Sequence, residues 1–121
     1  MEESILISVK KVLGPGVEGN DFDLDILIHL NSVLAIVTQL GIGPKNGIYV
    51  EDASTTWSDL LGDDSAYLSM VRSYVTAKVR LLFDPPVSSA VLQSLERTCS
   101  EFEWRANVAV ENKELEEAAT V

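Results

Sequence analysis

The fold of this chain is decided by the stretch KVRLLFDPP, residues 78–86, in which an amphipathic helical pattern runs into two consecutive prolines. Proline has no backbone N–H and pushes the preceding residue out of the α region, so a helix arriving from about Tyr67 must end near Phe83. Ser88 and Ser89 then offer hydroxyls that can cap a new helix. The stretch therefore predicts a helical hairpin with a stiff elbow.

Outward from this elbow, apolar residues recur at helical spacing in several further segments, each ended by glycine or proline. A short turn beginning at Trp57 is also expected, because Thr56 and Asp59 have the spacing of a capping box. We therefore predict an all-α protein, a small four-helix bundle with one additional helical turn. The helices are expected over residues 2–13, 21–40, 63–84 and 88–107.

Two segments of the chain lie outside the predicted bundle. Residues 41–64 form a glycine-hinged, acidic connecting arm, with a local charge of −5 over residues 48–64. After Asn107 the apolar pattern fails and glutamates dominate, which is typical of a flexible or partner-ordered tail. We thus expect a single helical domain over residues 1–107 and an acidic flexible tail over residues 108–121.

The composition excludes several classes of protein. The chain has 121 residues, a net charge of −10 and one cysteine. This charge argues against binding nucleic acid by neutralising phosphates, and a single cysteine excludes an intramolecular disulfide and a cysteine-rich zinc site. No apolar run is long enough to span a membrane. We expect a soluble protein that stays in the cytoplasm of the cell that makes it.

Residues that could carry chemistry do not form a catalytic or metal-binding pattern. Asp21, Asp23 and Asp25 alternate as in a calcium loop, but the glycine and the final bidentate acid of that loop are missing. His29 has no second ligand at suitable spacing, and a local interaction with Asp25 is favoured over a catalytic dyad. Cys99 falls on an apolar helix face, which indicates a buried thiol. We expect no enzyme, no cofactor and no bound metal.

The two tryptophans have different surroundings. Trp57 lies in a polar connection, where it either docks back on the bundle or anchors a neighbouring subunit, and the sequence favours neither alternative. Trp104 is rotated away from the apolar positions of its helix, so we expect it at a rim or an interface rather than in the core. Acidic residues of the arm and basic residues of the third long helix could pair between copies of the chain. The residues expected at a subunit or partner interface are Tyr49, Glu51, Asp52, Trp57, Arg72, Lys78, Arg80, Trp104, Glu111 and Glu114.

Taken together, the order of these segments resembles the head-tail connector, or adaptor, proteins of tailed bacteriophages and their prophages. The resemblance covers residues 4 to about 107. The segments that carry it are ILISVKKVLG at 5–14, the helix over 25–43 with HLNSV and TQLG, TWSDLL at 56–61, the stretch 74–86 ending in RLLFDPP, and residues 88–107 ending in EFEWRAN.

The resemblance implies a structural virion protein of the neck, the head-tail junction, assembled in the cytoplasm of the host bacterium. Copies would form a ring under the portal protein, most simply twelve-fold or close to it, that extends the DNA channel and docks the stopper or tail-terminator protein. DNA would pass through without specific binding, and no membrane would be involved. The alternative is a small acidic helical module that binds or regulates another protein as a monomer or dimer.

Overall fold

The computed structural model describes residues 3–62 and 65–119, and their side chains except those of residues 65–67 and 109–119. These residues form five α-helices and one short 3-10 helix, and no strand occurs among them. The predicted all-α class is confirmed. The elements are α1 (Ile5–Leu13), η1 (Pro15–Val17), α2 (Asp23–Gln39), α3 (Trp57–Leu61), α4 (Ser65–Phe83) and α5 (Ser89–Ala119).

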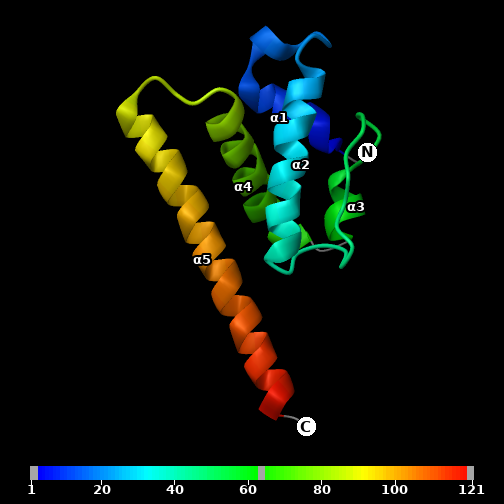
Figure 1. Cartoon of the computed structure of the whole chain (residues 1–121), viewed down its shortest axis with the longest axis vertical. Helices are drawn as coiled ribbons and strands as arrows, with labels where there is room; N and C mark the ends of the chain where they lie inside the picture. The colour runs from blue at the N-terminus through cyan, green and yellow to red at the C-terminus, as the bar shows by residue number, and fades with distance from the viewer. Residues whose placement is uncertain (1–2, 63–64, 120–121) are drawn as a thin grey trace.

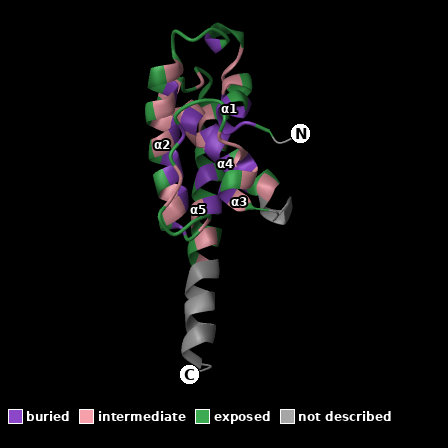
Figure 2. Cartoon of the chain, turned by 90° about the vertical axis from the view of Figure 1, so that its right-hand side faces the viewer, coloured by how far each residue is buried: buried purple, intermediate pink, exposed green. Residues whose placement is uncertain are grey.

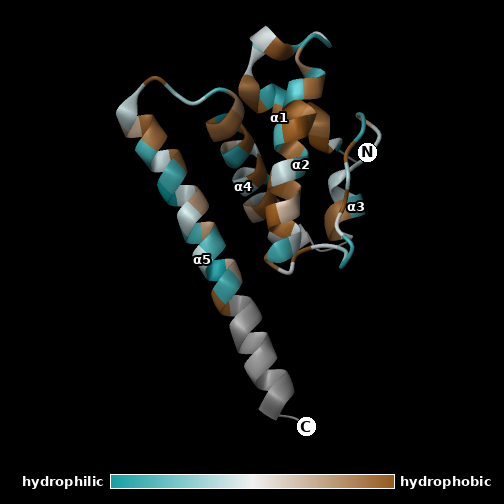
Figure 3. Cartoon of the chain, in the orientation of Figure 1, coloured by the Kyte–Doolittle hydropathy of each residue, from teal (hydrophilic) through white to brown (hydrophobic). Residues whose placement is uncertain are grey.

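The core lies between α1, α2 and α4, with α3 closing one side (Figures 1 and 2). Figure 3 shows hydrophobic residues concentrated on these helices, whereas the part of α5 that it colours by hydropathy is mixed. Each of α1, α2 and α4 contributes side chains with no exposed surface, which is why these three helices hold together as one unit. The fully buried set includes Ile5, Val9, Ile26, Leu30, Val33, Leu34, Val37, Val71, Val75 and Val79.

Capping and glycine residues set several helix ends, and α1 ends at Leu13 as predicted but starts at Ile5 rather than at residue 2. The Ser4 hydroxyl accepts a hydrogen bond from the Ile7 N–H at 3.3 Å and starts α1, and Gly14, at a φ of 102°, ends it. At α3 the predicted capping box is present, because the Thr56 hydroxyl and the Asp59 carboxylate each accept from the other residue's backbone N–H.

The predicted elbow connects α4 to α5. Helix α4 ends at Phe83, and the Asp84 N–H still donates to the Arg80 carbonyl at 2.9 Å. After the two prolines, the Ser88 carbonyl accepts from the Leu92 N–H at 3.0 Å and starts α5. Helix α5 then turns back along α4, its main packing partner, and its last turns extend beyond the other helices (Figure 1).

Helix α5 is longer than predicted. It does not end near Asn107 but continues to Ala119. The apolar pattern fails after Asn107, but the helix continues there beyond the other helices (Figure 1), so the failure of that pattern does not end a helix by itself. Residues 108–119 contain no glycine or proline and are rich in glutamate and alanine, which favour helix. That residues 108–121 act as a separate tail stays a prediction.

Candidate assembly surfaces

The connection between α2 and α3, residues 40–56, is fixed to α2 by one asparagine. The Asn31 side chain accepts from the Val50 N–H at 2.8 Å and donates to the Val50 carbonyl at 3.0 Å. Val50 is fully buried beneath this pair of bonds. Because side chains alternate in extended backbone, its neighbours Tyr49 and Glu51 are turned outward, and 71% of Tyr49 is exposed.

The arm is also held at other points, so it is more ordered than its glycine content predicts. Gly43 has a φ of 84° and packs so closely that an added Cβ would lie 2.9 Å from Leu60 Cδ1. At the far end the Ile5 N–H donates to the Thr55 carbonyl at 3.1 Å. Near the tip, the Asp52 carboxylate accepts from the Ser54 N–H at 2.8 Å and from its hydroxyl, and these bonds lower the Asp52 pKa.

Trp57 is not a surface anchor. Only 3% of it is exposed, and its indole N–H donates to the Ser8 hydroxyl at 3.0 Å. Of the two alternatives left open by the sequence, the structure has the one in which Trp57 docks on its own bundle. The prediction that it lies at a subunit interface is wrong, because its ring already fills the space between α3 and α1.

Two of the three cations predicted to face a neighbour from α4 are engaged within the chain. Arg72 pairs with Glu3, and Lys78 pairs with Glu103 on α5 at 3.5 Å. Arg80 is half-buried and takes part in no ion pair among the described residues. Pairing between the acidic arm of one copy and α4 of another therefore has little free positive charge to use.

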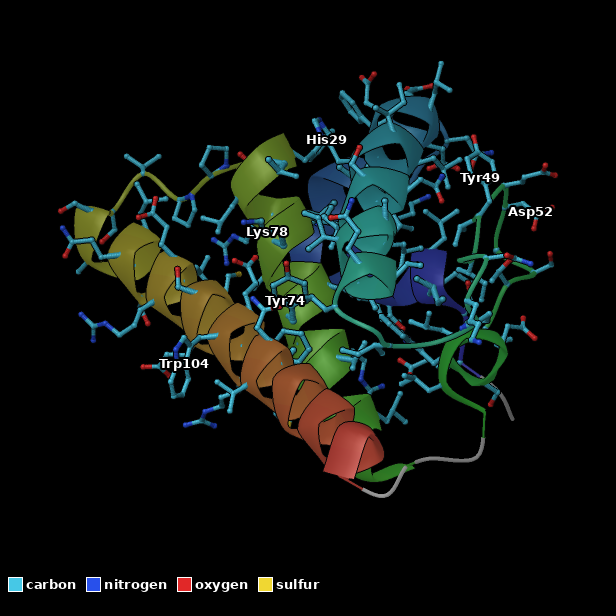
Figure 4. The ribbon with its side chains drawn as sticks, turned by 60° about the horizontal axis from the view of Figure 1, so that its bottom comes forward. His29, Tyr49, Asp52, Tyr74, Lys78 and Trp104 are labelled. Atoms are coloured by element: carbon cyan, nitrogen blue, oxygen red, sulfur yellow. The ribbon has the colours of Figure 1, made fainter. Side chains whose placement is uncertain are left out.

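The seam between α4 and α5 is built around two stacked rings. Tyr74 and Phe102 have ring centroids 4.5 Å apart at an interplanar angle of 19°. The Tyr74 hydroxyl donates to the Glu103 carboxylate at 2.6 Å, beside Lys78 (Figure 4). Cys99 is buried in the same seam, as predicted, and burial raises the pKa of its thiol.

The seam between α4 and α5 leads us to expect that the free energy of unfolding falls at alkaline pH. Burial, then the Glu103 carboxylate, raises the pKa of Tyr74 well above its usual value, whereas an unfolded tyrosine loses its proton near pH 10. As the pH rises above about 10 the unfolded state binds fewer protons than the folded state, so the free energy of unfolding falls. Cys99 also acts on Tyr74, and Lys78 pairs with the same Glu103 carboxylate, so the wild type must be compared with a variant.

That variant is Tyr74→Phe, and its free energy of unfolding is compared with that of the wild type by urea unfolding from pH 7 to 11. At pH 7 it is expected to lose about 1–2 kcal/mol with the hydrogen bond to a charged partner. Above about pH 10 its stability should fall less steeply than that of the wild type, so the gap narrows. If the difference in free energy of unfolding between the two proteins stayed constant from pH 7 to 11, the raised pKa of Tyr74 would be contradicted.

Trp104 lies on the opposite side of α5 from this seam. It is 67% exposed and points away from the bundle in Figure 4, which confirms that it is not a core residue. Figure 4 also places Tyr49 and Asp52 on the side of the molecule away from Trp104. The side chains of Glu111 and Glu114, also predicted at an interface, lie outside the described residues.

Two of the residues weighed for catalysis or metal binding, Asp23 and His29, make contacts within the chain. Asp23 pairs with Lys10 at 2.8 Å, and the His29 ring meets the Phe83 ring edge-on at 6.2 Å. No bond joins His29 to Asp25 in the part of the chain that the structure describes, so the expected local interaction is absent. Among the described residues no cluster of three or more histidine, cysteine or acidic side chains could hold a metal ion. Nor is any described helix long and apolar enough to cross a membrane.

A protein-family model matches this chain. The family model described as phage connector protein matches residues 5–113, which is nearly all of the chain. The chain belongs to the phage connector family. The match extends past Asn107, the end of the region that carries the resemblance in the sequence, and into the second half of α5. No curated protein and no solved structure matches.

Membership identifies the chain as a structural connector protein of a phage and implies a location at the neck of the virion. For this connector, the structure adds residues to the surfaces that sequence reasoning found. Asn31 is one, and its only signal is a polar residue within the apolar pattern of α2. Arg97 and Arg105 are others, exposed on α5 near Trp104 and absent from every ion pair of the described residues.

Proposed function

We propose that this connector assembles into a closed ring under the portal protein, twelve-fold or close to it. The ring extends the DNA channel and docks the stopper or tail-terminator protein. The observation that carries the proposal is the family match over residues 5–113. Assembly takes place in the cytoplasm of the host bacterium, and the protein has a structural rather than an enzymatic role.

Two features of the chain support a ring. The exposed aromatic side chains Tyr49 and Trp104 lie on opposite sides of one protomer, as a contact between unlike surfaces requires (Figure 4). Contacts of this kind close into rings when the rotation between copies allows it. In addition, the net charge of −10 repels the phosphate backbone, which suits a channel through which DNA slides without binding.

The test is to mix the purified connector with the portal protein of the same phage and to image the complexes by negative stain. A second ring stacked on the portal, with a mass near twelve copies, is the expected result. Light scattering of the connector alone over a range of concentrations is the companion measurement. A connector that remains a monomer or dimer and leaves the portal bare would favour the alternative, a small acidic binding module.

A further inference from the structure

We infer that the outward side of α5 around Trp104 docks the segment around Tyr49 from the arm of a second copy of this chain. The inference rests on the ring proposed above and names the two surfaces that meet in it. The surface on α5, called here the outer α5 face, comprises Arg97, Glu101, Trp104, Arg105 and Val108.

The outer α5 face has no partner among the described residues of the chain. Successive helix residues are rotated by about 100°, so Trp104 lies about 200° from Phe102 and about 140° from Cys99, which both face α4. With 67% of its surface exposed, Trp104 is the largest exposed apolar side chain of the described residues. Tryptophan and arginine together are typical of the central residues of protein interfaces.

The outer α5 face carries two arginines against one acidic residue, Glu101, so its net charge is positive and favours an acidic occupant. Arg97 and Arg105 are exposed and form no ion pair among the described residues, in a chain whose net charge is −10. Two copies with this net charge repel each other, so a contact between them needs positive charge on one surface to meet negative charge on the other. The arm supplies it, because Glu51 and Asp52 are exposed next to Tyr49. Aromatic and charged side chains of both surfaces are then complementary.

The arm is prepared to meet a partner without further ordering. The two bonds from Asn31 to Val50 fix the backbone, and the Asp52 turn fixes the tip. Side chains that are already directed outward lose less conformational entropy on binding. Because the arm and the outer α5 face are on opposite sides of the protomer, each copy can use both at once, which a ring requires (Figures 1 and 4).

The experiment is a charge exchange between two single variants, Arg105→Glu on the outer α5 face and Glu51→Arg on the arm. Ring formation is measured by light scattering and by negative stain in the presence of the portal protein. Each variant alone places like charges in every contact, so the concentration needed for half-maximal assembly is expected to rise about tenfold or more. In a mixture of the two, alternating copies join opposite charges at every contact, and assembly is expected to return.

Matched controls separate this effect from net charge and from folding. Lys11→Glu and Glu18→Arg change the charge by the same amounts at exposed positions outside both surfaces, and are expected to assemble as the wild type does. Trp104→Ala is expected to weaken assembly while its thermal melt is unchanged.

The inference is overturned if both single variants assemble like their controls, or if the mixture assembles no better than either variant. It is also overturned if Leu24→Ser with Ile28→Ser, on the exposed side of α2, blocks assembly while Glu51→Arg does not. A wild-type chain that never assembles, even with the portal, instead removes the proposed function on which the inference rests.

Discussion

Trp57→Ala is expected to destabilise the protein by about 3–5 kcal/mol, the usual cost of truncating a buried tryptophan. Trp57 is only 3% exposed and packs between α3 and α1, so truncating its side chain leaves a cavity that the short α3 cannot fill. The variant also leaves the Ser8 hydroxyl without the indole N–H that now donates to it. Since small domains are stable by only about 5–15 kcal/mol, most of the margin would be lost.

Urea unfolding followed by circular dichroism measures this cost, and the second tryptophan provides the control. Trp104→Ala removes the same side chain from an exposed position and is expected to stay within about 0.5 kcal/mol of the wild type. The two variants thus separate stability from assembly: Trp57→Ala should lose assembly through unfolding, and Trp104→Ala without it. Equal melts for the two variants would contradict the burial of Trp57.

The sequence predicted the elements of this fold because their ends depend on local chemistry. Two prolines end α4, a glycine ends α1, and the Thr56 capping box starts α3, whereas the Ser4 cap at the start of α1 was not predicted. Each signal acts over three or four residues, so it can be read without knowing the fold.

Which distant residue a side chain contacts could not be predicted in the same way. Trp57 reaches Ser8, 49 residues away, and Arg72 reaches Glu3, 69 residues away. Which of two equal alternatives a tryptophan takes, or whether an arginine is free for a neighbour, depends on which helices become adjacent. The ion pairs of Arg72 and Lys78 could not be foreseen for this reason, and whether the α4 cations meet a neighbour stays a prediction. The exposure of Trp104, in contrast, followed from its position on one helix.

Glycine content misled the interpretation of the arm. Three glycines and a proline from Gly41 to Gly47 indicate a loop, and such a composition predicts an adaptable one. In the structure Gly43 and Gly47 both have a positive φ and both lie against bundle side chains, where a Cβ would be 2.9 Å from Leu60 and 3.1 Å from Thr38. Here glycine permits close packing, and an asparagine on another element fixes the backbone.

Phe102→Ala is expected to release α5 from an otherwise folded protein. Phe102 is buried and stacks on Tyr74, and truncating such a residue costs about 3 kcal/mol or more. Helices α1, α2 and α4 share a core to which α5 adds mainly Cys99 and Phe102. The loss should therefore fall on the docking of α5 and leave the opening of the other helices little changed.

Native-state hydrogen exchange distinguishes local undocking of α5 from unfolding of the whole protein. Amides of α5 between residues 95 and 106 are expected to exchange about 100-fold faster in Phe102→Ala, since about 1.4 kcal/mol corresponds to a factor of ten. The half-exposed Val91, truncated to alanine on the same helix, serves as the control and should change exchange little. Equal acceleration in α2 and α5 would instead mean that the whole protein opens as one unit.

The same variant connects the fold to assembly. Trp104, Arg97 and Arg105 can meet an arm only if α5 is held at a fixed angle, and the seam with α4 supplies that angle. Phe102→Ala should therefore weaken ring formation although every residue of the outer α5 face is intact. If ring formation were unchanged while exchange in α5 rose, the contact between copies could not lie on the outer α5 face.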